Sequence, residues 1–189
     1  MAIKHLPLLA VALIVSLTAS AQTTKQIPLT PSQNLENVNL PFSQAVWAGD
    51  TLYVSGWLDP ERKTHTDTQS QIVGILGDMQ KFLVSQNVTL GDVVMMRVYL
   101  AGDPAKGGKM DIPGARAAER QFFGTKDQPN KPAVTAVQVV LPAADSGALA
   151  EIDVIVVCPK SPPGAHTFSR CSSARPAGSA GACGSVGLI

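Results

Sequence analysis

The chain is poor in the residues that build disulfide scaffolds, metal centres and nucleic-acid surfaces. Its 189 residues include three cysteines and three histidines, and 5% of them are aromatic. So few cysteines, and an odd number of them, exclude a disulfide-rich scaffold, because one cysteine always stays unpaired. A net charge of +1 provides no long-range attraction to phosphate backbones or anionic membranes. Because 45% of the residues are hydrophobic, we expect one small globular domain.

Both ends of the chain differ in composition from the part between them. Residues 1–21 combine Lys4, a short apolar run and a small-x-small ending at Ala19–Ala21, which is typical of a secretory signal peptide. The apolar run is shorter than the roughly 20 residues that span a bilayer. We therefore expect cleavage after Ala21, export to the periplasm or the extracellular space, and no membrane attachment afterwards. Residues 158–189 are rich in Pro, Gly, Ser and Ala, and we expect a disordered tail there.

The remaining sequence predicts a lead-in loop over 22–40 and one domain over 41–157. Alternating or continuous apolar runs predict strands, and apolar residues at steps of three and four predict helices. The expected order is strands over 42–48 and 51–55, a helix over 67–87, a strand over 93–100, a helix over 110–123, and strands over 133–141 and 149–157. This β-β-α-β-α-β-β order predicts an α+β fold, with a mixed sheet and both helices on one face.

The first helix and the third strand carry the clearest patterns. Thr66 or Asp67 can cap the start of the helix, and Asn87 can end it. The strand over 93–100 is almost continuously apolar, which predicts burial on both faces. Because no third helix is available to cover the free face of the sheet, we expect self-association. The apolar face of the helix consists of Ile72, Ile75, Leu76, Met79, Phe82 and Leu83.

The predicted domain offers few groups for the common catalytic constellations. His65 is its only histidine, and its polar surroundings before a helix favour a solvated loop residue. One histidine without a neighbouring cysteine speaks against a zinc site, and it leaves no plausible Ser-His-Asp or Cys-His arrangement. The run Gly107–Lys109 lacks the rest of a phosphate-binding loop. The sequence therefore predicts neither a metal nor a cofactor.

Two carboxylates interrupt the last apolar strand. Glu151 and Asp153 are two residues apart, so a strand places both on the same face. Two interpretations are open: the solvated face of an edge strand, or a carboxylate that orients a water molecule for hydrolysis. Trp57 is interpreted as a core residue, with a pocket wall as the alternative.

Several short motifs, taken in order, resemble the Rid (YjgF, reactive intermediate deaminase) family. The resemblance extends from about Pro41 to Val156. It implies a chorismate mutase-like fold and a homotrimer with clefts between subunits. It also implies hydrolysis of imines and enamines to 2-oxo acids and ammonia, without metal or cofactor. The motifs that carry it are Pro41–Val46, Leu52–Gly56, Gln71 with Gly77 and Met79, Leu90–Val94, Val98–Leu100, Lys131–Ala133 and Ala150–Asp153.

The resemblance also assigns roles to individual residues. Glu151 matches the glutamate that positions the attacking water, and Gly56 matches the glycine whose backbone lines the cleft. Phe42 occupies the position of an aromatic wall. Val134 stands where the archetypal members have the arginine that clamps the carboxylate of the substrate. Because valine cannot form a charge-assisted pair with a carboxylate, the archetypal 2-imino acids are not the expected substrates.

Two functions of different classes follow from these observations. The first is an exported deaminase, a hydrolase of small imines or enamines that are uncharged or anchored differently. The alternative is a trimer of the same fold that binds a small molecule without catalysis. Ribonuclease activity, a label attached to some relatives, ranks last, because neutral charge and few aromatic residues give RNA neither an electrostatic track nor a stacking platform.

Overall fold

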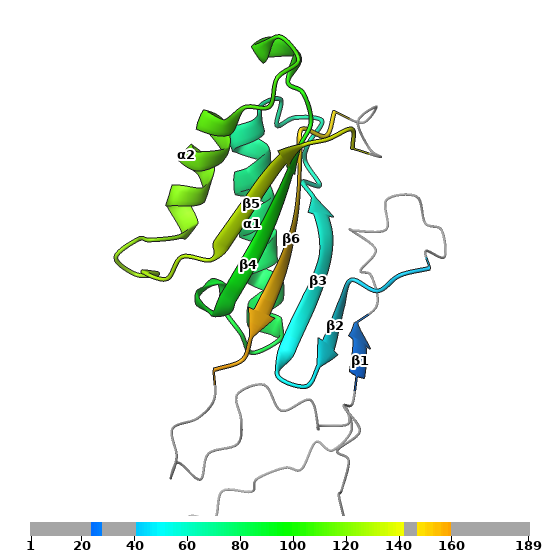
Figure 1. Ribbon diagram of the computed structural model, residues 1–189, viewed down its shortest axis with the longest axis vertical. Coiled ribbons are helices and arrows are strands. Elements are labelled where there is room, and N and C mark those ends of the chain that lie inside the picture. The colour runs from blue at the N-terminus through cyan, green and yellow to red at the C-terminus, as the bar shows by residue number, and fades with distance from the viewer. Residues whose placement is uncertain (1–23, 28–40, 142–146, 160–189) are drawn as a thin grey trace, which may run out of the picture.

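The computed structural model describes residues 24–27, 41–141 and 147–159 (Figure 1). The predicted signal peptide over 1–21 lies outside these residues and stays a prediction. The predicted disordered tail over 158–189 also lies outside them except for its first two residues, and there the boundary is wrong, because Cys158 is buried in the core and its N–H donates to the Asp50 carbonyl at 2.9 Å. None of the helices in the described part of the chain combines the length and hydropathy needed to cross a membrane.

The described residues form a mixed sheet and two α-helices, which confirms the predicted α+β class. The six-stranded sheet has the order β1-β2-β3-β6-β4-β5, in which β4 and β5 are parallel and the other neighbours are antiparallel. Short 3₁₀ turns precede β4 and α2. The elements are β1 (Thr24–Ile27), β2 (Ala45–Ala48), β3 (Thr51–Leu58), α1 (Thr68–Ser85), β4 (Val93–Leu100), α2 (Ile112–Phe122), β5 (Ala133–Gln138) and β6 (Ala150–Val157).

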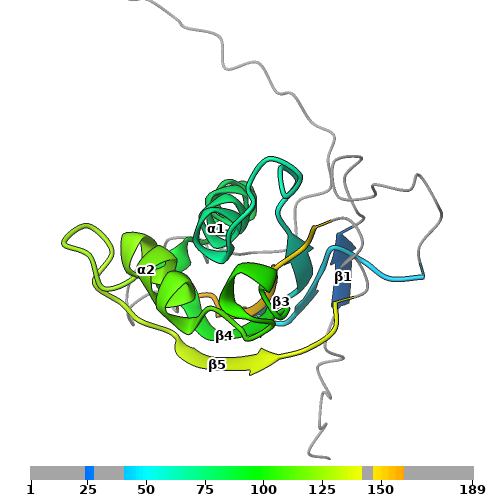
Figure 2. The same ribbon diagram turned by 90° about the horizontal axis from the view of Figure 1, so that it is seen from above.

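Both helices pack on the same side of the sheet, as Figure 2 shows. We call this side the covered face and the opposite side, which faces the viewer in Figure 1, the open face. The main core fills the space between the helices and the covered face. Its fully buried residues include five of the six apolar positions predicted for α1: Ile72, Ile75, Leu76, Met79 and Leu83.

Local chemistry explains where α1 begins and how it meets the sheet. The Asp67 side chain caps the helix and accepts a hydrogen bond from the Ser70 backbone N–H at 2.9 Å, as the sequence predicts. Phe82, the sixth apolar position, contacts Trp57 with ring centroids 5.2 Å apart. Since Trp57 is only 8% exposed, its interpretation as a core residue is confirmed.

Two further expectations from the sequence are wrong, and one of the two interpretations left open for the last strand is excluded. The segment predicted as a loop over 22–40 contains the strand β1, which pairs with β2 at the edge of the sheet and whose mostly polar residues show no apolar period. The last strand, β6, is not an edge strand, because it lies between β3 and β4. Strand β4 is buried on one face only within the chain, since its residues alternate between the core and the open face.

Candidate functional site

Glu151 lies on the open face, near the start of the central strand β6. Its cross-strand neighbours are Leu58 on β3 and Tyr99 on β4. Both neighbours pack against a second, smaller apolar cluster, which we call the end cluster and which consists of Ala101, Leu141, Ala148 and Leu149. The carboxylate therefore emerges from a strand among apolar side chains, in the part of the sheet where β3 ends.

This environment changes the acidity of Glu151. The side chain is half-buried, and burial raises the pKa of the Glu151 carboxyl above its ordinary value, while the negative charge of Asp153 raises it further. Among the described residues, no hydrogen bond or ion pair reaches this carboxylate. A carboxyl with a raised pKa and free oxygens is suited to accept and return a proton.

Gly56 lies directly beside Glu151. A methyl group at Gly56 would overlap Oε1 of Glu151, so only glycine leaves the carboxylate in its present place. The two residues come together because the pairing of β3 with β6 is irregular between Val54 and Trp57. Two of the three predicted site residues are thus adjacent, although they are 95 positions apart in the sequence.

Phe42, the third predicted site residue, is 54% exposed. The residues after it run along β3: the Ser55 hydroxyl donates to the Ser43 carbonyl at 2.7 Å, and the Ser55 N–H donates to the Gln44 carbonyl at 2.9 Å. Because Ser55 precedes Gly56, Phe42 belongs to a segment that borders the same region of the sheet. Its ring is exposed in the single chain.

Val134 lies on the opposite face from Glu151. It pairs with the buried Met96 of β4 and packs against the main core. Within one chain, the structure therefore does not bring Val134 and Glu151 together.

The open face also holds a polar network that the sequence analysis missed. Nε of Arg97 donates to Oδ1 of Asp153 at 2.7 Å, and the Tyr99 hydroxyl donates to Oδ2 of the same carboxylate at 2.9 Å. The hydrogen bond to Asp153 raises the pKa of the Arg97 guanidinium. Arg97 and Asp153 are directly opposite each other on β4 and β6, so only knowledge of the strand order could have predicted the pair.

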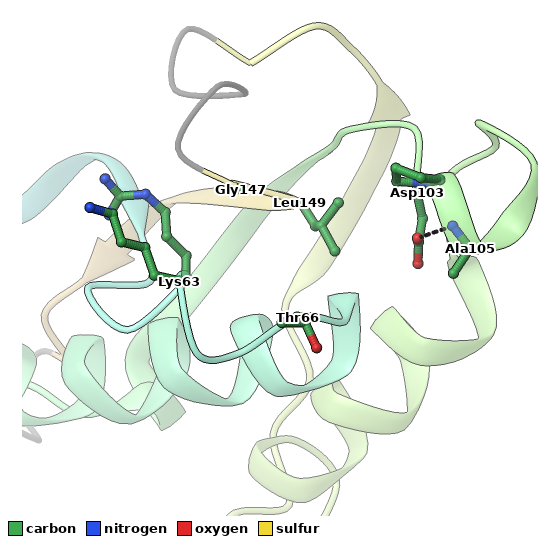
Figure 3. Close-up of a pocket in the computed structure, with 8 residues that line it drawn as sticks. Lys63, Thr66, Asp103, Ala105, Gly147 and Leu149 are labelled. Carbon is green, nitrogen blue, oxygen red and sulfur yellow. Dashed lines mark hydrogen bonds between the residues drawn. The ribbon is translucent and has the colours of Figure 1, made fainter.

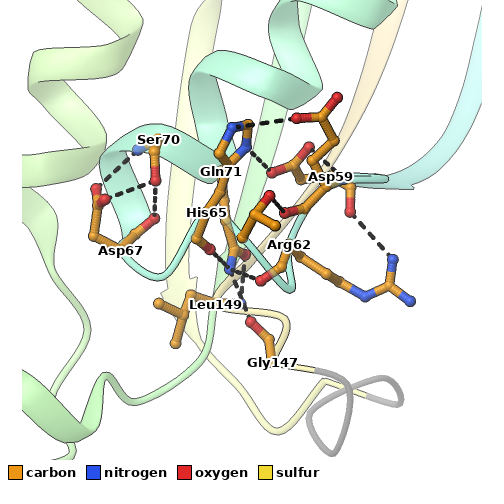
Figure 4. A network of polar contacts seen from close by, with 10 residues as sticks. Asp59, Arg62, His65, Asp67, Ser70, Gln71, Gly147 and Leu149 are labelled. Carbon is orange, nitrogen blue, oxygen red and sulfur yellow. Dashed lines mark hydrogen bonds and ion pairs between the residues drawn. The ribbon is translucent and has the colours of Figure 1, made fainter.

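His65 lies in a loop and is partly exposed, as its polar neighbours predicted, but it has a partner that they did not predict. Its Nδ1 lies 2.6 Å from Oδ2 of Asp59, whose side chain is buried. This hydrogen bond is the largest cause of a raised His65 pKa, and the charges of Asp59, Glu61 and Asp67 act in the same direction. The contact fixes the loop between β3 and α1 (Figure 4).

The buried Gln71 joins this loop to the segment that leads into β6 (Figure 4). Its side-chain NH₂ donates to the carbonyls of His65 and Gly147, each at 2.8 Å. Its side-chain oxygen accepts from the Leu149 N–H at 2.7 Å. Because Leu149 is two residues before Glu151, Gln71 helps to position the start of the strand that carries the carboxylate.

A separate depression of about 510 Å³ lies between the loops near the start of α1 (Figure 3). Its lining includes Lys63, Thr66, Asp103 and Leu149, but none of the predicted site residues. The end cluster, to which Leu149 belongs, lies between this depression and the strand positions beside Glu151. No group of three side chains suited to hold a metal ion occurs in the described residues.

The fold and the matched residues together define the class of the protein. The model of the family described as endoribonuclease L-PSP matches residues 33–158. The chain therefore belongs to this family, which is the YjgF/Rid family. A RutC family protein of Saccharolobus solfataricus is 36% identical over 64 residues, or 32% of this chain. The chain spans about half of that relative, 51% of its length.

Solved structures, two of them described as members of this family, share the fold. A YjgF-family protein of Neisseria meningitidis superposes with a TM-score of 0.56 at 16% identity, over 74% of this chain and 98% of that protein. A Mycobacterium tuberculosis member of the YjgF/YER057c/UK114 family superposes with a TM-score of 0.53 at 22% identity, over 71% of this chain and 99% of that protein. TdcF of E. coli, solved with bound serine, superposes with a TM-score of 0.54 at 25% identity, over 70% of this chain and 98% of that protein. These likenesses confirm the predicted YjgF fold.

Proposed function

We propose that this protein is a cofactor-free deaminase that hydrolyses small imines or enamines. The observation that carries the proposal is Glu151, a half-buried carboxyl with a raised pKa and free oxygens beside Gly56. Membership of the YjgF/Rid family supports it, and so does the small amino acid bound by TdcF. Phe42 is proposed to form an aromatic wall of the same site.

The reaction needs only water and one proton-transferring group. The Glu151 carboxylate accepts a proton from a water molecule while the water oxygen bonds to the imine carbon. The electron pair of the C=N bond moves to nitrogen, which takes up a proton and gives a carbinolamine. The C–N bond then breaks as nitrogen leaves as ammonia, and loss of the hydroxyl proton leaves a carbonyl. An enamine enters the same route after protonation at carbon.

The site is proposed to lie between subunits of a homotrimer. Half of the open face is apolar: the half-buried Ile155 on β6 lies between Tyr53 on β3 and the half-buried Met95 on β4, and Val157 follows on β6. Tyr53 and Val157 are 48% and 40% exposed. The other half carries Glu151, Asp153 and Arg97. Apolar side chains exposed on a central sheet face favour a partner, and packing of further copies there would place the ionisable half at the edge of the contact.

The anchoring of the substrate is proposed to differ from that of the archetypal deaminases. Valine replaces the clamping arginine at Val134, and its side chain packs against the core. We therefore propose substrates other than those held by that arginine.

We also propose that the protein is exported, because residues 1–21 resemble a secretory signal peptide.

Release of ammonia tests the proposal. The purified protein is incubated with a panel of imines formed from small amines and carbonyl compounds, alongside a Glu151→Gln variant. Because positioned acid–base groups contribute roughly 10²- to 10⁴-fold, the variant should lose activity by that factor while its circular dichroism stays unchanged. Asp78→Asn, which removes a partly exposed carboxylate on α1 that pairs with Lys81, is the matched control and should keep full activity.

Two outcomes of this experiment would contradict the proposal. Unchanged ammonia release by Glu151→Gln would remove the catalytic role of the carboxylate. Ligand binding without any ammonia release by the unmodified protein would favour the alternative, a non-catalytic binding trimer.

A further inference from the structure

Arg97 is the one arginine on the open face among the described residues, and it lies close to Glu151 in the sheet. It is directly opposite Asp153 on the neighbouring strand, and Glu151 is two residues from Asp153 on the same face. Diagonal neighbours of this kind have Cα atoms about 7–8 Å apart. A molecule of a few non-hydrogen atoms can therefore touch both side chains.

The ion pair with Asp153 leaves the outer end of the guanidinium available. Arg97 uses Nε for this contact, and within the described part of the chain its two terminal nitrogens donate no hydrogen bond. The side chain is 44% exposed, whereas that of Asp153 is 14% exposed. The carboxylate thus holds the inner edge of a planar donor group whose outer edge faces solvent, a geometry suited to bind a carboxylate with two parallel hydrogen bonds.

Tyr99 strengthens this arrangement. Its hydroxyl donates to the second oxygen of Asp153 at 2.9 Å, so two side chains of β4 hold the two oxygens of the Asp153 carboxylate on β6. The terminal donors of Arg97 are thereby fixed in the sheet before a ligand arrives, and less side-chain entropy is lost when a ligand binds.

We propose that Arg97 binds the carboxylate of an anionic imine or enamine substrate, with Asp153 as its positioning residue. The inference rests on the proposed function, since Glu151 supplies the chemistry, but it assigns the anchor to β4 instead of to the position of Val134 on β5. The substrate class becomes small carboxylate-bearing imines whose acid group lies toward β4.

Binding of stable carbonyl analogues tests this anchor without requiring turnover. The probes are 2-oxobutanoate, 4-oxopentanoate and the uncharged 2-butanone, titrated into the whole protein and followed by NMR. The unmodified protein should bind at least one oxo acid more tightly than 2-butanone. Arg97→Gln should weaken that binding by about 10- to 150-fold and leave 2-butanone unaffected. Arg120→Gln removes an exposed guanidinium from α2. It should change neither the binding of the oxo acid nor the binding of 2-butanone.

The controls separate this proposal from the proposed function. If Arg97→Gln unfolds because Asp153 loses its partner, the double variant Arg97→Gln with Asp153→Asn removes both charges and should show the same loss. Equal binding of oxo acids by Arg97→Gln and the unmodified protein would overturn the anchor, even where ammonia release depends on Glu151. Arg97-dependent binding without ammonia release would instead overturn the deaminase and keep the anchor.

Discussion

The two faces of the sheet differ in what they need for stability. The covered face packs on α1 and α2, and residues such as Leu76 and Ile152 are fully buried within one chain. The open face leaves Tyr53 half-exposed and arranges Arg97 and Asp153 in an ion pair. The comparison indicates that the covered face makes the fold, whereas the open face carries the residues of the proposed chemistry and the proposed subunit contacts.

The largest expected effect on stability belongs to the covered face. Leu76→Ala leaves a cavity in the core and should lower the free energy of unfolding by about 2–5 kcal/mol, measured by urea denaturation. Val84→Ala on the same helix is the control: Val84 is 60% exposed, so the change should stay within about 0.5 kcal/mol. Equal effects of the two substitutions would show that α1 does not pack on the sheet as described.

A smaller but specific effect is expected at Gly56. The added methyl group of Gly56→Ala overlaps the end of the Glu151 side chain, which can move without disturbing the backbone. A displacement of about 1 Å in a catalytic group costs on the order of 10²-fold in rate. We expect that loss in ammonia release with a nearly unchanged melting temperature. Full activity of Gly56→Ala would mean that the position of Glu151 beside Gly56 has no catalytic importance.

The smallest expected effect is the pH dependence that Glu151 gives to stability. Because the pKa of this carboxyl is raised in the folded state, the folded protein binds its proton more tightly than the unfolded chain does. The resulting stabilisation is present below the unfolded pKa and is lost as pH rises through the folded pKa. The unfolding free energy of the unmodified protein, minus that of Glu151→Gln, should therefore fall with rising pH. A flat or rising difference would contradict the burial of this group.

Much of the covered face could be predicted from the sequence, because local patterns determine it. The apolar steps from Ile72 to Leu83 and the cap at Asp67 each lie within one turn or one helix, where side-chain periodicity is informative. The strand β1 escaped prediction because its four residues, Thr24–Ile27, are mostly polar and exposed. An edge strand of this kind has no apolar periodicity from which it could be predicted.

The open face could be predicted only in part. The alternation around Glu151 and Asp153 showed that both share a face, and the resemblance pointed to Gly56. The contact of Arg97 with Asp153 joins residues 56 positions apart and depends on β6 lying between β3 and β4. The pairing of His65 with Asp59 crosses a loop, where polar composition alone suggested solvent. Contacts set by strand order or loop path leave no local periodicity.

The mass of the intact protein in solution tests most directly whether the open face is completed by other copies of the chain. Light scattering at micromolar concentration should give three times the mass of one chain, because apolar side chains such as Tyr53 and Val157 are then covered. The mass of a single chain under the same conditions would contradict both the proposed trimer and a site shared between subunits.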